Sequence, residues 1–386
     1  MKRIAILGST GSIGVQTLDV VRRNPDLFRV EALAAGSRLD LLEGQVREFQ
    51  PSVVSVADEA IARELKQRLA DHSPSLWIGH SAEGLERAAT LPIVSLVVGG
   101  LPGSAGLLPT FAAVNAGKDV ALATKEVLVM AGSLFMETVR RKGVKLLPVD
   151  SEQSAIFQCL EGNQHAAIRR LILTASGGPF REMAPEEMAQ VTVERTLEHP
   201  RWKMGPKVTV DSATLMNKGF EVIEARWLFD VSASRIEVVI HPQSICHSMV
   251  EFEDGSILAQ LGATDMRIPI SYALAYPERI DSGVAAIDFA HLGSLTFRKP
   301  DWDRFPLLRA AYSALDDETG ASSIILNAAD EVAVELFLSR RIGFMDIPRI
   351  VLDALNSVPP ARVTNLEEIK QFHSDVVTRV QRNAVA

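Results

Sequence analysis

The stretch Ile4-Ala-Ile-Leu-Gly8-Ser-Thr-Gly11-Ser-Ile-Gly14 decides the fold prediction for the first part of the chain. Its short apolar run is typical of a buried strand, and its glycines allow a tight turn into the helix predicted from Val15 to Arg23. In such a turn, backbone N–H groups at a helix N-terminus can approach a pyrophosphate. The spacing G-x-x-G-x-x-G departs from the commoner G-x-G-x-x-G, so a glycine-rich turn without a ligand is the alternative.

Further β-rich runs follow this loop and alternate with helical patterns. Val30–Ala35, Val53–Ala57 and Ile93–Val98 are short, apolar and rich in β-branched residues, and Glu126–Lys142 has one apolar face. Strands that alternate with helices indicate βαβ units and a parallel sheet. We therefore expect an N-terminal Rossmann-like domain.

The tip of the second predicted strand indicates which dinucleotide fits. Gly36-Ser37-Arg38 follows that strand, where an NAD site usually has a carboxylate for the ribose hydroxyls. A hydroxyl and a guanidinium suit a 2′-phosphate instead. The sequence thus favours NADP(H), the alternative being that Arg38 is a solvated loop residue.

The rest of the chain changes character. Ile236–Ile240, Ile245–Phe252 and Ser256–Leu261 follow one another without helices, which predicts an antiparallel portion added to the sheet. Ala213–Phe229 is predicted as one helix, and the signals after Phe305 are helical only. The predicted fold class is α/β plus α+β with a C-terminal helical bundle. The expected domains are 1–149 for the cofactor, 150–275 for catalysis with a flexible flap at about 181–206, a connector at 276–304 and a helical domain at 305–386.

Two carboxylates stand at the end of the strand predicted from Val144 to Val149. Asp150 and Glu152 would face the same way along an extended strand, and such a pair repels unless a cation or a proton lies between its members. A site for Mg²⁺ or Mn²⁺ is one interpretation. The other is the N-terminus of a helix predicted from Ser154 to Leu160, where carboxylates act as caps.

A second polar cluster opens the predicted helix at Ala213–Phe229. Asn217, Lys218 and Glu221 share one face, which with Ser212 suggests a grip for a phosphate and a third metal ligand. The alternative is a solvated face with an ordinary Lys–Glu pair. His199 and Trp202 precede this cluster in a long polar stretch that could act as a lid, or else as a plain surface loop.

Composition excludes several classes of protein. The chain has 386 residues, 47% of them hydrophobic and 23% charged, which is the ordinary balance of a globular protein rather than a disordered one. The formal net charge of −8 argues against nucleic acid or an anionic membrane surface as partner. Two cysteines without metal-type spacing suit a reducing compartment, and the short apolar N-terminus suits a first strand rather than a signal segment. We expect a cytoplasmic protein.

The motifs together resemble those of 1-deoxy-D-xylulose 5-phosphate reductoisomerases. The matching stretches occur in the family's order and are Gly8–Gly14, Ala123–Glu126, Val149–Ala155, Thr174–Phe180, His199–Gly205, Asn217–Glu221 and His241–Ile245. The resemblance implies an NADPH- and divalent-metal-dependent enzyme, using Mg²⁺, Mn²⁺ or Co²⁺, that is usually a homodimer. Such enzymes rearrange 1-deoxy-D-xylulose 5-phosphate, a step usually written as retro-aldol then aldol, and reduce the aldehyde to 2-C-methyl-D-erythritol 4-phosphate for non-mevalonate isoprenoid synthesis.

The resemblance also implies roles for individual residues at matching positions. The implied metal ligands are Asp150, Glu152 and Glu221, and Lys125 and Glu152 are the implied candidates for moving protons. The implied substrate contacts are Lys125, Ser151, Glu152, Ser176, His199, Trp202, Met204, Ser212, Asn217, Lys218 and Glu221. The implied NADPH contacts are Thr10, Gly11, Ser12, Ile13, Gly36, Ser37, Arg38, Thr124, Glu126 and Gly205.

One departure from the family pattern is Thr124, where many members are expected to have Asn; Thr keeps a hydroxyl but loses the amide. Two other functions are compatible with a Rossmann domain joined to an α+β domain. One is a metal-independent NADP dehydrogenase of an amino-acid semialdehyde, and the other is an NADP-sensing module without catalysis. Neither needs three carboxylates beside a phosphate grip.

Overall fold

The computed structural model describes residues 1–71, 75–163, 165–202, 204–359 and 361–384. The chain forms two compact units. The first unit contains residues 1–127, 137–154 and 265–285, and the second contains 128–136, 155–264 and 286–386. Two helices cross from one unit to the other along the chain, α6 (Glu126–Lys142) and α7 (Ser151–Leu160). The predicted division into four parts stays a prediction.

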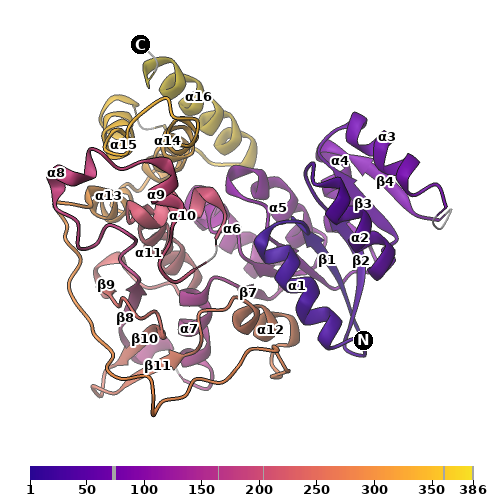
Figure 1. The fold of residues 1–386 in the computed structure, drawn as a ribbon, viewed down its shortest axis with the longest axis horizontal. Helices are drawn as coiled ribbons and strands as arrows, with labels where there is room; N and C mark the ends of the chain where they lie inside the picture. The colour runs from indigo at the N-terminus through magenta and orange to yellow at the C-terminus, as the bar shows by residue number, and fades with distance from the viewer. Residues whose placement is uncertain (72–74, 164, 203, 360, 385–386) are drawn as a thin grey trace. The chain divides into compact units, whose positions relative to one another are not determined.

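The first unit is built on a parallel sheet of seven strands in the order β4-β3-β2-β1-β5-β6-β7. Its strands are β1 (Lys2–Leu7), β2 (Phe28–Ala34), β3 (Val53–Val56), β4 (Trp77–His80), β5 (Leu96–Gly99), β6 (Asp119–Leu122) and β7 (Leu146–Pro148). Its helices are α1 (Ser12–Arg23), α2 (Leu39–Phe49), α3 (Glu59–Arg68), α4 (Ser81–Thr90), η1 (Gly103–Gly106), α5 (Leu107–Asn115) and α12 (Arg267–Ala275). Figure 1 shows β1–β4 and α1–α4 in indigo to purple. The predicted Rossmann-like sheet is confirmed.

The glycine loop lies where the strand order reverses, since β1 pairs with both β2 and β5. Gly8 has a φ of +90°, and a Cβ on it would lie 2.5 Å from the carbonyl oxygen of Gly100. A Cβ on Gly14 would lie 2.3 Å from the carbonyl oxygen of Gly8. Only glycine permits this approach of backbone to backbone, and such a switch point is where ligands bind in open α/β sheets.

The second unit contains a separate sheet of four strands in the order β11-β10-β8-β9. Its strands are β8 (Ile168–Ala175), β9 (Ile236–Ile240), β10 (Cys246–Phe252) and β11 (Ile257–Leu261). Its helices are η2 (His165–Ala167), α8 (Pro185–Met188), α9 (Val193–Leu197), α10 (Pro206–Ala213), α11 (Met216–Leu228), η3 (Ala233–Arg235), α13 (Pro306–Ala314), α14 (Ala321–Leu338), α15 (Asp346–Ser357) and α16 (Leu366–Ala384). Strands β8 to β11 lie side by side in Figure 1.

Two expectations for this region are wrong in detail. The strands form their own sheet rather than an addition to the first, and β9 pairs in parallel with β8, because a long helical crossover joins these two strands. Among the strands of this sheet, β10 pairs antiparallel with both β8 and β11, and the Glu253-Asp254-Gly255 turn accounts for its pairing with β11. The helix expected at 213–229 is confirmed as α11, which begins three residues later than predicted, and Leu215, at a φ of +58°, separates it from the preceding helix α10. No glycine or proline marks that break in the sequence.

The C-terminal helices share one apolar core with the four-stranded sheet. This core joins buried side chains of β8–β10, α11 and α13–α16. Phe344 packs between the two regions in edge-to-face contacts. The centroid of its ring lies 5.1 Å from the ring centroid of Phe180, which follows β8, and 5.8 Å from that of Phe337 on α14. The helical region is therefore packed as part of the second unit. In the described part of the chain, no helix is both long and apolar enough to span a bilayer.

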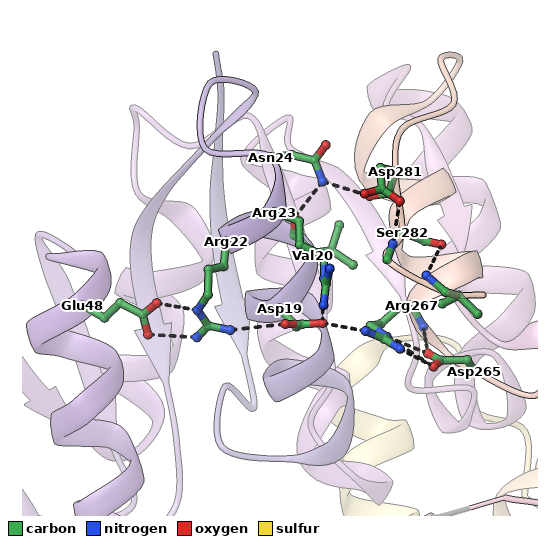
Figure 2. Close-up of polar contacts among 12 residues, drawn as sticks. Asp19, Val20, Arg22, Arg23, Asn24, Glu48, Asp265, Arg267, Asp281 and Ser282 are labelled. Carbon is green, nitrogen blue, oxygen red and sulfur yellow. Dashed lines mark hydrogen bonds and ion pairs between the residues drawn. The ribbon is translucent and has the colours of Figure 1, made fainter.

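An ionic network holds the returning segment 265–285 within the first unit (Figure 2). Arg267, at the start of α12, donates to Asp19 of α1 at 2.9 Å and to Asp265 at 2.7 Å. Arg22 binds both carboxylate oxygens of Glu48 on α2, at 2.6 and 2.9 Å. The hydrogen bonds from Arg267 lower the pKa of Asp265, although burial opposes the shift. The network thus ties α12 to α1.

We predict that Arg267→Met lowers the free energy of unfolding by about 1 kcal/mol at neutral pH, because it removes a partly buried guanidinium shared by two carboxylates. The pKa of Asp265 is depressed in the folded state, so its contribution is present above the unfolded pKa of about 3.9 and is lost as pH falls further. Urea unfolding at pH 7 and near pH 3 measures both effects. The control is Arg63→Met, which removes only an exposed pair with Glu59; equal effects of the two changes would contradict the prediction.

Candidate active site

The first unit presents an anion-binding loop. Gly11 is the N-cap of α1 and has no side chain to cap the helix, and the first turn of α1 carries no acidic residue. The N–H groups and the positive end of the helix dipole are therefore suited to a phosphate. The end of β2 holds the loop in place, since the N–H groups of Gly8 and Ser9 both donate to the carbonyl of Ala34 at 2.8 Å.

Arg38 lies beside this loop. Its guanidinium donates to the carbonyl of Thr10, which places the positive charge beside the glycine turn. Gln45 of α2 donates to the carbonyl of Ser9 at 2.9 Å and so fixes the same loop from α2. A Cβ on Gly36 would meet no atom within 4 Å, so there is space beside the tip of β2. The arrangement fits an adenosine bearing a 2′-phosphate.

A buried ion pair lies beyond β6 and β7 in the same unit. Lys125, at the N-cap of α6, forms an ion pair with Asp150, and 9% of the Lys125 side chain and 14% of the Asp150 side chain are exposed. Asp150 occupies the cap position of α7, since its backbone carbonyl accepts from the N–H of Ser154, while its carboxylate faces the lysine. Ser151 donates its hydroxyl hydrogen to Glu152 at 2.5 Å. Asp150 therefore lies at the N-terminus of α7 with its carboxylate paired to Lys125, and the metal-site interpretation stays a prediction.

Thr124 is used by the backbone of the first unit. Its hydroxyl lies 2.5 Å from the carbonyl oxygen of Leu101 and 3.2 Å from that of Gly99, and the residue is 3% exposed. Its single hydroxyl hydrogen is therefore used in hydrogen bonding to these backbone carbonyls. The expected contact of Thr124 with NADPH stays a prediction.

The second unit presents a hydroxyl whose hydrogen is left for a ligand. His199 Nδ1 accepts from the backbone N–H groups of Arg201 at 3.2 Å and of Trp202 at 2.9 Å. Nδ1 therefore carries no proton, and Nε2 donates to Ser176 Oγ, 3.0 Å away. The N–H of Gly178 also donates to Ser176 Oγ, at 3.2 Å. With two donors on its oxygen, Ser176 can direct its own hydrogen at an acceptor such as a phosphate oxygen.

Burial keeps this histidine neutral. It lowers the pKa of His199 to about 4, and the positive charge of Arg181 acts in the same direction. The neutral form is the one that accepts two N–H groups at Nδ1, so geometry and protonation agree.

The first turns of α11 hold the second cationic cluster. Lys218 forms an ion pair with Glu221, and Asn217 donates to the other oxygen of Glu221 at 2.5 Å. Only 3% of the Lys218 side chain and none of Glu221 is exposed, so the alternative of a solvated face is wrong. Burying two charges is unfavourable unless they are paired, and a buried pair on one face is a feature of binding sites.

The predicted flap is more ordered than a loop. Between residues 181 and 206, α8 and α9 form, and Met183, Met188 and Val191 are buried in the core of the second unit. Trp202 lies beyond this packed part, with its ring 6.0 Å from that of His247. The ring of His241 serves the backbone of the second unit: Nδ1 faces the carbonyl of Thr296 at 2.9 Å, and Nε2 accepts from backbone N–H groups.

Sequence reasoning missed one polar cluster beside these residues. Lys207 of α10 contacts Asp211 and, on α14, Asp330. The i,i+4 spacing of Lys207 and Asp211 is a visible signal for the first contact. The contact with Asp330 joins segments far apart in the chain, which no local pattern could reveal.

The fold and the two sets of residues define a class of protein. The first unit has a glycine loop with a guanidinium at the tip of β2, and the chain also contains buried lysine–carboxylate pairs and a serine that can donate to a phosphate. These features are typical of an NADP-dependent oxidoreductase for a phosphorylated substrate.

Comparison with known proteins gives the family. Family models match residues 4–132 (1-deoxy-D-xylulose 5-phosphate reductoisomerase), 146–229 (the C-terminal domain of that enzyme) and 261–379 (DXP reductoisomerase C-terminal domain). The chain is 52% identical over 369 residues to the 1-deoxy-D-xylulose 5-phosphate reductoisomerase of Geotalea uraniireducens, covering 96% of this chain and 95% of the relative. It is 54% identical to that of Trichlorobacter lovleyi, with coverages of 96% and 94%.

Solved structures agree with this result. A crystal structure of DOX-P reductoisomerase in complex with NADPH, fosmidomycin and magnesium is 42% identical, with a TM-score of 0.94 over 99% of this chain and 98% of that one. The Zymomonas mobilis enzyme in complex with NADPH is 41% identical, with a TM-score of 0.91 and the same coverages. The chain belongs to the 1-deoxy-D-xylulose 5-phosphate reductoisomerase family, which confirms the predicted resemblance and does not favour the semialdehyde dehydrogenase.

We predict that the imidazole of His199 titrates with a midpoint of about 4. Because this value lies below the ordinary pKa of about 6.5, the neutral ring stabilises the folded state fully above pH ~6.5, and this contribution is lost as pH falls toward the folded value. An NMR titration of the ring resonances, assigned by their absence in His199→Gln, measures the midpoint. A midpoint near 6.5 would show that the ring is solvated and the Ser176 contact absent.

Proposed function

We propose that this chain converts 1-deoxy-D-xylulose 5-phosphate to 2-C-methyl-D-erythritol 4-phosphate with NADPH and a divalent metal ion. The observation that carries the proposal is the identity of 52% over 96% of the chain to an enzyme of that name. The buried ion pairs Lys125–Asp150 and Lys218–Glu221 support it, because they stand at the positions that the family resemblance implies.

The metal ligands we propose are Asp150, Glu152 and Glu221, each of which offers a carboxylate oxygen. Hard oxygen donors suit Mg²⁺ and Mn²⁺, and Co²⁺ is a third candidate. When bound, the metal ion would act as a Lewis acid on the carbonyl and hydroxyl oxygens of the substrate.

Lys125 and Glu152 are the residues we propose for proton movement. The ammonium of Lys125, held by Asp150, would donate to a substrate oxygen that gains negative charge during the rearrangement. Glu152 already accepts the hydroxyl hydrogen of Ser151, so its carboxylate is oriented to accept a proton from a substrate hydroxyl. Ser151 would also contact the substrate.

The substrate phosphate would be held by the second unit. Ser176 directs a hydrogen at the ligand because His199 and Gly178 occupy its lone pairs. Lys218 supplies a positive charge, and Ser212 and Asn217 complete the proposed set. Ser212 lies on α10, and Asn217 and Lys218 lie on α11, which reduces the ordering that binding requires.

The lid we propose is shorter than the sequence suggested. Met188 and Thr196 are fully packed, so closure would fall on residues 198–205, of which Lys203 lies outside the described residues. Trp202 and Met204 would cover the substrate and exclude water, and Gly205 would contact the cofactor. On the cofactor side, residues 10–13 would hold the pyrophosphate, residues 36–38 the 2′-phosphate, and Glu126 the nicotinamide end, so that the bound NADPH supplies a hydride to the aldehyde.

We also propose a homodimer that forms through β11. This strand is at the edge of its sheet, and Ile257 and Leu258 are 50% and 43% exposed. An exposed apolar edge strand readily pairs with another copy. The two buried cysteines, both free thiols, support a reducing, cytoplasmic location.

We predict that Arg38→Ala raises the KM for NADPH about tenfold or more and leaves the KM for NADH within about twofold. The charged hydrogen bonds to a 2′-phosphate are lost, and NADH has no such group. Initial rates with both cofactors measure the effect. Arg63→Ala, which removes an exposed arginine of α3, is the control; equal losses with both cofactors would contradict a role in phosphate recognition.

We predict that substrate-dependent oxidation of NADPH requires Mg²⁺ or Mn²⁺ and is abolished by EDTA. Glu221→Gln is expected to weaken Mn²⁺ binding, followed by electron paramagnetic resonance, by about 100-fold or more, because a charged ligand is lost. Glu335→Gln, an exposed carboxylate of α14, is the control. Turnover that is insensitive to EDTA would overturn the metal assignment, and bound NADPH without turnover would restore the semialdehyde or sensor function.

A further inference from the structure

A buried charged cluster joins α10 to α14 in the second unit. The ammonium of Lys207 donates to Asp211 at 2.6 Å and to Asp330 at 2.9 Å. The Asp211 and Asp330 side chains are 3% and 0% exposed, and that of Lys207 is 19% exposed. Removing three charges from water is costly, and apolar residues of similar volume would often be as stable. The cluster is therefore better explained by what it positions than by stability.

The same ammonium reaches a third helix. Lys207 Nζ lies 5.1 Å from the ring centroid of Phe220, on α11, in a cation–π contact. One side chain thus fixes α10, α11 and α14 relative to one another. Of these three helices, α10 carries Ser212, and α11 carries Asn217 and Lys218.

The cluster is adjacent to the residues proposed for the phosphate. Ser212 follows Asp211 directly at the end of α10. A Cβ on Gly178 would lie 2.6 Å from the carbonyl oxygen of Ser212, so the loop that carries Ser176 packs against this end of the helix. A displacement of α10 by a few tenths of an ångström would therefore move both serines.

A hydrogen-bonded relay continues from α10 into α11. The hydroxyl of Thr214 donates to the carbonyl of Asp211 at 3.2 Å and accepts from the N–H of Met216 at 3.3 Å. It spans the left-handed residue Leu215, where the helix breaks. These hydrogen bonds couple the position of α10 to that of the first turn of α11, where Asn217 and Lys218 lie.

We propose that Lys207, Asp211 and Asp330 are positioning residues for the substrate phosphate, through which helix α14 sets the geometry of Ser212 and of the α10–α11 junction without touching the substrate. This inference rests on the proposed function. It gives the C-terminal helices a part in substrate affinity besides their part in the core.

Asp330 offers a variant that separates geometry from charge. Burial raises the pKa of this carboxyl, and the nearby ammonium of Lys207 opposes the shift. Because position depends on the hydrogen bond from Lys207, Asp330→Asn keeps an oxygen acceptor at the same place and is expected to preserve the arrangement. Asp330→Leu fills the space but removes the acceptor.

The test compares full-length Lys207→Met, Asp330→Leu and Asp330→Asn with the unmodified protein. The measurements are the KM for 1-deoxy-D-xylulose 5-phosphate, kcat, the Kd of NADPH from its fluorescence and the Kd of inorganic phosphate from the thermal shift it induces. We expect Lys207→Met and Asp330→Leu to raise the substrate KM and the phosphate Kd about tenfold, with the NADPH Kd within about twofold. Asp330→Asn is expected to stay within about threefold of the unmodified protein.

The control is Arg226→Met, which removes another i,i+4 ion pair, with Asp230, on the exposed side of α11. Unchanged phosphate affinity in both disruptive variants, or an equal loss of NADPH affinity, would overturn the positioning role. Should Lys207→Met fail to fold, the difference in substrate KM and phosphate Kd between Asp330→Leu and Asp330→Asn tests the positioning role. Absence of turnover in the unmodified protein would refute the proposed function alone, since phosphate affinity still tests the positioning role.

Discussion

The cost of burying charge governs the functional part of this protein. Lys125, Lys218 and Lys207 all have largely buried side chains, and each ammonium faces one or more carboxylates. An unpaired cation in these places would be expelled or neutralised, so each lysine fixes the position of an acidic partner and is fixed by it. The pairs place Asp150 and Glu221 with defined orientations before any ligand binds. Preorganised charge of this kind lowers the ordering cost of binding.

A second constraint acts through the backbone rather than through side chains. The approach of Gly8 to Gly100, and of Gly14 to Gly8, leaves no space for a Cβ, and it brings the N-terminus of α1 to the switch point of the sheet. The guanidinium of Arg38 reaches the same loop from the end of β2. Local geometry around three glycines thus shapes the proposed cofactor side, whereas the proposed phosphate side depends on side chains brought together by the core of the second unit.

That core explains why the C-terminal helices matter to the site. Phe180 follows the loop that carries Ser176, and it packs on Phe344 between α14 and α15. Asp330 of α14 contacts Lys207 of α10. Apolar packing and one ionic contact therefore connect the phosphate side to helices that carry none of the residues predicted to bind ligands.

The sequence by itself determined the parallel sheet, the glycine loop and α6 with both of its ends, because these depend on local periodicity and on motifs within a few residues. It could not show that β9 pairs in parallel with β8, because strand pairing depends on a crossover of some sixty residues rather than on either strand. Nor could it show that Leu215 takes a left-handed conformation between α10 and α11, because no glycine stands there to indicate it. Whether Lys218 and Glu221 were solvated or buried was likewise open, since their spacing is the same in both cases. Only the tertiary structure, by removing them from water and adding Asp330 to Lys207, decided which of these charges are buried and paired.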